Sequence, residues 1–255
     1  MPIESEIYYY SFSSTSSGIN PPIVLIHGAG GNHLFWPPGI RRLPGYRIHS
    51  LDLPGHGKSP GRGRQSIDAY VADILKWMRE MELNQAVFIG HSMGSAIAIR
   101  LALNYPDFVA GLGLIGAGAS LRVHPDLLDS TSSVTTFDNA VVKITKLSFS
   151  PSTSERLVEL ATKRMLETRQ SVLYGDLRAC DEFDETTHIS NIHQPTIIIC
   201  GVDDNMTPIR YSHFLSSKIQ KSELEIIPDA GHMVMMEQPQ AVEFAINKFM
   251  NKIRL

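Results

Sequence analysis

The sequence predicts an α/β protein built on a mainly parallel, doubly wound sheet, with a helical insertion between two of its strands. From about residue 22, short apolar runs of strand length alternate with helix-like segments. These runs are mostly apolar throughout, as expected of strands that are covered on both faces. Later, roughly seventy residues carry helical patterns and no convincing strand. Alternation of strand and helix favours a parallel sheet with helices on both faces.

Composition and charge narrow the class of protein. The 255 residues are 43% hydrophobic, enough to bury the core of one domain with an inserted subdomain. The net charge is −3 and no lysine or arginine cluster occurs, which argues against a nucleic-acid partner. No apolar run approaches the ~20 residues that span a bilayer, so we expect no membrane segment. Residues 1–6 (MPIESE) contain early acids and no basic-then-apolar run, so no signal peptide is expected. Cys180 and Cys200 are expected as reduced thiols in a cytoplasmic protein.

Six strands are expected in the sheet. The segment Glu6–Phe12 before them has room for at most a small hairpin, and the polar stretch 11–17 (SFSSTSS) is expected to be a turn or loop. The predicted strands are Ile23–His27, Tyr46–Asp52, Ala86–Gly90, Val109–Ile115, Thr196–Gly201 and Leu224–Pro228.

Three helices are expected to pack on this sheet. Ser66 can cap the first, which should end near Met81. The second, Ser92–Asn104, is apolar almost all round and should be buried against the sheet. The last is Pro239–Met250. In the first helix the apolar residues recur at helical spacing: Ile67, Tyr70, Val71, Ile74, Leu75 and Met78.

The insertion, residues 119–191, interrupts the alternation of strands and helices. The sequence Ser152–Glu155 (STSE) is a capping box, and apolar residues follow it at helical spacing. The sheet pattern resumes at Thr196. The sequence therefore predicts an α/β core formed by residues 1–118 and 192–255, with residues 119–191 as a helical cap.

A candidate nucleophile lies in the sequence Gly90-His91-Ser92-Met93-Gly94, between a strand and a helix. The two glycines allow a sharp, closely packed turn that leaves the serine hydroxyl exposed at the carboxyl end of the strand. The helix that follows points backbone N–H groups towards developing negative charge. This context favours Ser92 as a nucleophile.

A serine nucleophile needs a base, and His232 is the best candidate. It lies in a loop between a late strand and the final helix. His91 is expected to point away from the serine, across the turn. We expect surface or capping roles for the histidines that have no such context, namely His33, His49, His124, His188, His193 and His213.

The base in turn needs a carboxylate that fixes its tautomer. Two acids, Asp203 and Asp204, follow the apolar strand that ends at Gly201. Spacing alone does not decide between them, although Asp203 is the better candidate for capping the turn.

An oxyanion hole needs preorganised N–H donors. One is the backbone N–H of Met93, which follows the nucleophile. The second should come from the glycine-rich loop 27–31 (HGAGG), in which Ala29 is favoured.

Taken together, the chain resembles the α/β-hydrolase superfamily over nearly its whole length, in particular carboxylesterase-like members with a helical cap. In that family the acid lies three residues past the glycine of a G-x-x-D-x-x-x-P block, which here is Asp204, and the order serine, acid, histidine is the expected one. Four sequence blocks carry the resemblance: HGAGG at 27–31 with Trp36 following, DLPGHGKS at 52–59, GHSMG at 90–94, and 201–208 together with Gly231-His232.

Differences from related subfamilies narrow the choice. Relatives with an aspartate nucleophile are disfavoured because residue 92 is serine. Carbon–carbon bond hydrolases resemble the chain in HGAGG and GHSMG but usually carry tryptophan after the catalytic histidine, where this chain has Met233. The candidate pocket residues are Phe35, Trp36 and Met233. Apolar residues of the insertion would roof the pocket or pack the cap against itself: Leu127, Leu128, Phe137, Val141, Ile144, Leu147 and Phe149.

The resulting hypothesis is a serine hydrolase that cleaves carboxylic esters of small, apolar substrates through an acyl-enzyme. Two alternatives stay open: a lactone or carbon–carbon bond hydrolase of the same fold, and a small-molecule receptor with slow turnover. The sequence contains no recognisable metal or nucleotide motif, so no metal and no cofactor are expected. The expected partner is a small-molecule ester, and the natural substrate and oligomeric state stay open.

Overall fold

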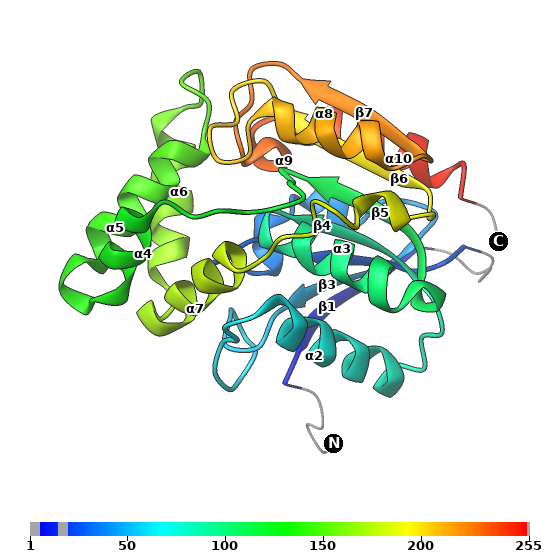
Figure 1. Cartoon of the computed structure of the whole chain (residues 1–255), viewed down its shortest axis with the longest axis horizontal. Helices are drawn as coiled ribbons and strands as arrows, with labels where there is room; N and C mark the ends of the chain where they lie inside the picture. Colours follow the sequence, from blue (N-terminus) through cyan, green and yellow to red (C-terminus); the bar gives the residue numbers. More distant parts are fainter. Residues whose placement is uncertain (1–5, 15–19, 254–255) are drawn as a thin grey trace.

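The structure is a computed structural model that describes residues 6–14 and 20–253 (Figure 1). The prediction that the N-terminus forms no signal peptide concerns residues outside this part of the chain, apart from Glu6. The polar loop predicted at 11–17 is wrong for residues 11–13, which belong to a strand, and residues 15–17 lie outside the described part. Cys180 and Cys200, which both lie within it, are free and buried. Within the described ranges, no helix is long and apolar enough to cross a membrane.

The described strands form one mainly parallel sheet, which confirms the predicted fold class. The strand order is β1-β3-β2-β4-β5-β6-β7, with β1 antiparallel to its neighbour and the other pairs parallel. The six predicted strands are present with small shifts at their ends. The strands are β1 (Tyr8–Ser13), β2 (Ile23–Ile26), β3 (Arg47–Asp52), β4 (Ala86–His91), β5 (Val109–Ile115), β6 (Thr196–Gly201) and β7 (Ser222–Ile227).

The N-terminal segment, which has room for at most a small hairpin, forms a single strand that belongs to the main sheet and does not precede it. β1 pairs along its whole length with β3, from Tyr8 opposite Asp52 to Ser13 opposite Arg47. The sequence YYYSFS contains no glycine, asparagine or proline that could turn the chain into a hairpin. Pairing with β1 also satisfies the backbone groups that β3 would otherwise expose at the edge of the sheet.

Helices cover both faces of the sheet and create two core clusters. Alternate residues of β2 belong to different clusters: Val24 and Ile26 to one, Ile23 and Leu25 to the other. Burial on both faces explains why these strands are apolar throughout. The first cluster is covered by α2 (Ile67–Glu80), α3 (Met93–Asn104) and α8 (Ile209–Lys218), and the second by α1 (Pro38–Arg41), α9 (Val234–Glu237) and α10 (Pro239–Met250).

The helices of the insertion lie together at one end of the sheet, between β5 and β6 along the chain (Figure 1). They share a third apolar cluster, which includes Phe137, Val141 and Leu173. The chain segments that follow β2, β4, β6 and β7 meet these helices, and they carry the residues of the candidate site. The helices are α4 (Pro125–Ser132), α5 (Val134–Ser148), α6 (Glu155–Leu166) and α7 (Gln170–Asp181).

Candidate active site

Ser92 occupies a strained turn between β4 and α3. Its φ of 53° and ψ of −116° lie in a region that non-glycine residues rarely adopt. The flanking glycines are required by close backbone approach: a Cβ on Gly90 would lie 2.1 Å from the carbonyl oxygen of Gly94, and one on Gly94 would lie 2.2 Å from that of Ile26. The turn thus presents residue 92 at the carboxyl end of β4, as expected of a nucleophile elbow.

His232 and Asp204 form a buried pair on the segments that follow β7 and β6. The imidazole Nδ1 lies 2.9 Å from Oδ2 of Asp204. Oδ1 of Asp204 accepts the backbone N–H groups of Met206 and Thr207, both at 2.8 Å. The Thr207 hydroxyl donates to Oδ2 at 2.7 Å, a contact that the sequence analysis missed.

These contacts keep Asp204 ionised. Burial alone would raise the pKa of this carboxyl, but the charge of His232 and the hydrogen bonds from His232 and Thr207 outweigh burial and lower the pKa. An ionised Asp204 accepts the proton of Nδ1 and therefore leaves Nε2 of His232 as the proton acceptor.

Asp203 lies elsewhere, and its expected role as a turn cap is wrong. Its carboxylate accepts the hydroxyl of Ser150, in the loop after α5, at 2.6 Å. The side chain therefore connects the end of β6 to the insertion. The structure thus separates two neighbouring acids that the residue pattern alone left undecided.

Ser92 and His232 line the same cavity, as does Met233. In the described part of the chain, no hydrogen bond joins the Ser92 hydroxyl to the imidazole. Catalytic hydrogen bonds are often long in ligand-free enzymes and tighten when substrate binds. The arrangement places a hydroxyl and an imidazole in the lining of one cavity, with Asp204 bound to Nδ1 of the ring.

The loop 27–31 lies against the serine turn. A Cβ on Gly28 would lie 3.2 Å from Cβ of Ser92. The carbonyl oxygen of Gly28 accepts both Nδ1–H of His27, at 2.8 Å, and the N–H of Gly31, at 3.0 Å. Ala29 lines the cavity. Among the hydrogen bonds of the described residues, none uses the N–H of Ala29 or Met93.

His91 contacts the candidate base, a contact that the sequence did not indicate. Its ring lies against that of His232, with centroids 4.8 Å apart, and its Nε2 donates to the backbone carbonyl of His232 at 2.9 Å. Burial, followed by the charge of His232, lowers the pKa of His91 to about 3. A neutral His91 therefore holds the backbone of the candidate base in place.

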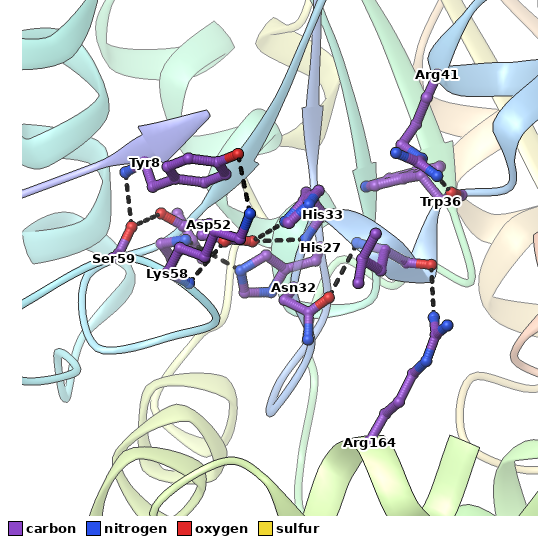
Figure 2. Close-up of polar contacts among 12 residues, drawn as sticks. Tyr8, His27, Asn32, His33, Trp36, Arg41, Asp52, Lys58, Ser59 and Arg164 are labelled. Carbon is purple, nitrogen blue, oxygen red and sulfur yellow. Dashed lines mark hydrogen bonds and ion pairs between the residues drawn. The ribbon is translucent and has the colours of Figure 1, made fainter. Parts of the chain in front are cut away.

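Two histidines expected at the surface are buried instead. His49 packs against the rings of Tyr9 and Trp77. His33 donates to Asp52, whose Oδ1 accepts its backbone N–H at 2.6 Å and lies 2.8 Å from its Nδ1 (Figure 2). Nothing in the sequence indicated that His49, in β3, and His33, in a short helical turn, are buried, because their partners come from distant segments.

Asp52 stabilises the loop that follows β3. Besides His33, its carboxylate accepts the backbone N–H of Lys58 at 2.9 Å (Figure 2). Burial raises the pKa of Asp52, but these hydrogen bonds outweigh burial and lower it. The neighbouring Leu53 donates its N–H to Nε2 of His27 at 3.0 Å. The DLPGHGKS segment therefore stabilises the loop 27–31 through this hydrogen bond to His27.

The cavity has a volume of about 240 Å³ and a largely apolar lining. Phe35 and Met233 line it, whereas Trp36 is fully buried in the core and does not. Leu127, Ile144 and Leu147 of the insertion contribute to the lining, and Phe137 and Val141 pack within the insertion instead. The remaining apolar lining comes from Leu121, Val123, Met165, Leu173, Leu177 and Met206.

Comparisons with known proteins agree with this geometry. A family model described as "alpha/beta hydrolase fold" matches residues 21–239. A pimeloyl-[acyl-carrier protein] methyl ester esterase of Vibrio vulnificus is 26% identical over 252 residues, covering 93% of this chain and 97% of that protein.

Solved structures show the same likeness. The structure of a thermophilic esterase is 30% identical, with a TM-score of 0.82 over 97% of this chain and 98% of that one. An enol-lactonase from Burkholderia xenovorans has a TM-score of 0.88 over 96% of each chain at 21% identity, a likeness of fold alone.

Proposed function

This chain belongs to the α/β-hydrolase fold family, and from that premise we propose that it cleaves carboxylic esters of small, apolar substrates through an acyl-enzyme. Named esterases and hydrolases among its relatives indicate a hydrolase of ester bonds. One observation carries the finer proposal: Ser92 and His232 line one largely apolar cavity, and Asp204 binds Nδ1 of His232, which leaves Nε2 without a bond to this carboxylate.

The proposed reaction has two steps with balanced proton transfers. Ser92 Oγ attacks the ester carbonyl carbon while Nε2 of His232 takes the hydroxyl proton. The negative charge on the carbonyl oxygen is stabilised by the N–H groups of Ala29 and Met93. Collapse breaks the bond to the alcohol, which leaves with the proton from His232. Water then attacks the acyl carbonyl carbon while Nε2 of His232 takes its proton. Collapse breaks the bond to Ser92 Oγ, which regains the proton from His232, and the carboxylic acid leaves.

The cavity supports a substrate of modest size. Its volume of about 240 Å³ exceeds the roughly 150 Å³ that suffices to hold benzene in a protein interior. The lining is largely apolar, so it favours an apolar acyl or alcohol group over a charged one. We further propose that residues 119–191 act as a cap over a core of residues 1–118 and 192–255, because the insertion supplies much of this lining.

A fluorophosphonate probe tests the nucleophile. Ser92 should be labelled, with no label on any other residue, and Ser92→Ala should abolish both labelling and turnover of p-nitrophenyl esters. Labelling that persists in Ser92→Ala would overturn the assignment. Multiple rapid turnovers by the native enzyme would separate an enzyme from a receptor, which would give a single turnover.

A substrate panel tests the bond that is cleaved. Ethyl esters of graded acyl length, a set of lactones and a vinylogous diketone should be compared as substrates. We expect the highest kcat/KM for an ester with an uncharged acyl group. Preferred cleavage of a lactone or of the diketone would favour the alternative hydrolase functions. The cytoplasmic location and the lack of a nucleic-acid partner stay predictions from the sequence.

A further inference from the structure

Gly30, in the candidate oxyanion loop, is held on both sides by the insertion. Its backbone N–H donates to Oδ2 of Asp176, on α7, at 2.8 Å. Its carbonyl oxygen accepts the hydroxyl of Thr168, between α6 and α7, at 2.9 Å. Both hydrogen bonds are buried, and both join residues more than 130 positions apart in the chain.

Gly30 needs such external support. Its φ of +64° lies in the left-handed region, and glycine restricts its own backbone less than any other residue does. The insertion also limits movement by packing: a Cβ on Gly30 would lie 2.9 Å from Cδ1 of Leu173. The conformation of this loop therefore depends on side chains that the loop does not contain.

Asp176 is itself fixed by several partners. It is fully buried, and its carboxylate accepts the Tyr70 hydroxyl at 2.5 Å and lies 2.7 Å from Nε2 of His56. Nδ1 of His56 lies 3.2 Å from the carbonyl oxygen of Pro54. Both ring nitrogens of His56 face acceptors, a geometry that favours the doubly protonated imidazolium.

The charges around this pair agree with that assignment. Burial opposes the positive charge of His56, but Asp176 outweighs burial and raises the pKa of the ring. The ring of His27 lies 4.8 Å from that of His56, and its pKa shifts in the opposite direction. Burial and the charge of His56 lower its pKa to about 4, which keeps it neutral. Neutral His27 accepts from Leu53 and donates to Gly28, so its tautomer is fixed.

We propose that Thr168 and Asp176 are positioning residues for the oxyanion hole. They fix the peptide groups on both sides of Gly30, and in this way they orient the preceding residue, Ala29, whose N–H is the proposed donor. Neither side chain lines the cavity, so they act through Gly30 and not on substrate. This inference rests on the proposed function, because it assigns a task to the donor that the proposed mechanism uses.

Thr168→Val provides the direct test, because it removes the hydroxyl and nearly preserves side-chain shape. Thr168→Ser restores the hydroxyl. Thr131→Val is the matched control: Thr131 is also buried in the insertion, but its hydroxyl bonds only to its own helix. The reaction measured is phosphonylation by a fluorophosphonate, in which the Ser92 Oγ–P bond forms, the P–F bond breaks, fluoride leaves and the proton passes to His232.

The expected result is a change in rate at constant affinity. A misaligned oxyanion donor should lower the maximal inactivation rate of Thr168→Val by about 10-fold or more, with the half-saturating probe concentration unchanged. Thr168→Ser should recover most of this loss, and Thr131→Val should match the native enzyme. A rate for Thr168→Val equal to that of Thr131→Val would overturn the proposal. If Ser92→Ala still reacted, the proposed function itself would fail instead.

A measurement on the native protein covers the case in which Thr168→Val does not fold. The amide proton of Gly30, bonded to buried Asp176, should exchange with solvent at least about 100-fold more slowly than a free peptide amide. Exchange at the free rate would show that Asp176 does not hold the loop, and would overturn the proposal.

Discussion

Two histidine–carboxylate pairs of this molecule have nearly the same length but different surroundings. His232 and Asp204 are separated by 2.9 Å, and His56 and Asp176 by 2.7 Å. His232 lines the cavity, and its second nitrogen is not held by Asp204. The second nitrogen of His56 faces the carbonyl oxygen of Pro54, and neither side chain of that pair reaches solvent.

The difference shows that a histidine–aspartate pair is not by itself a catalytic device. A carboxylate on one ring nitrogen prepares the other nitrogen to accept a proton, provided that this nitrogen is free and reaches a cavity. When both nitrogens bind acceptors, the ring carries a fixed charge and connects segments of the fold. The same two residue types thus serve as a proposed base in one place and as a support for the oxyanion loop in the other.

The sharpest test of this comparison is the same substitution in both histidines. His232→Gln should lower kcat for ester hydrolysis by about 10⁶-fold, because loss of one triad member disables the unit. His56→Gln should lower kcat far less in the fraction that remains folded. Turnover should be measured for both and divided by the folded fraction obtained from urea denaturation, because loss of His232 would also slow labelling by a fluorophosphonate. Equal losses in the two variants would mean that the pairs are not functionally distinct.

The next largest effect on kcat is expected from substitution of one of the two acids after β6, Asp203 and Asp204. Asp204→Asn should lower kcat by about 10⁴-fold, because an amide does not stabilise the imidazolium and favours the wrong tautomer. Asp203→Asn should retain nearly all activity, since the Asp203 carboxylate accepts a hydrogen bond from Ser150 at the edge of the insertion and, among the described residues, none from His232. Steady-state kinetics on one ester suffices. Greater damage from Asp203→Asn would reverse the assignment of the acid.

Local patterns made much of the site predictable. The serine turn, the glycine-rich loop and the last histidine each lie in a short sequence whose geometry depends on neighbouring residues, such as Gly90 and Gly94. The sheet followed from its apolar strands for the same reason. What these patterns left undecided was the choice between Asp203 and Asp204, which resemblance to a family supplied.

The supporting residues were not predictable in this way. Asp176 and Thr168 lie on the insertion, in amphipathic segments where a polar residue is expected to face solvent. Their partner, Gly30, lies far away in the sequence. The single N-terminal strand was missed for a similar reason, because it pairs with a distant strand and makes no turn of its own. Contacts between distant segments depend on the assembled fold and produce no periodic pattern in the sequence.

The buried pair His56–Asp176 should contribute more to the free energy of unfolding than an exposed histidine–carboxylate pair does. His56→Gln leaves Asp176 buried without its main charged partner, so the free energy of unfolding should fall by about 3–5 kcal/mol. His188 forms an ion pair of similar length, 2.8 Å, with Glu185, but its ring is 60% exposed. His188→Gln should therefore cost less than about 1 kcal/mol. Urea denaturation of both variants measures the difference, and equal costs would contradict the role given to burial.

The pH dependence of stability is the smallest effect and tests the charge on His56. Because its pKa is raised in the folded protein, the unfolded chain loses this proton first as pH rises from about 6.5. The stabilisation from the charged ring is therefore complete below about pH 6.5 and is lost as pH rises through the folded pKa.

The difference in unfolding free energy between the native protein and His56→Gln isolates this contribution from other titrating groups. It should shrink above about pH 6.5, by no more than about 1.4 kcal/mol per pH unit, because only one proton is involved. His27 contributes with the opposite sign and differs between the two proteins, since the charge of His56 helps to lower its pKa to about 4, but its contribution changes only below about pH 6.5 and leaves this range unaffected. A difference that stays constant from pH 6 to 9 would mean that His56 does not lose a proton preferentially on unfolding. The two pairs would then differ in accessibility and not in charge.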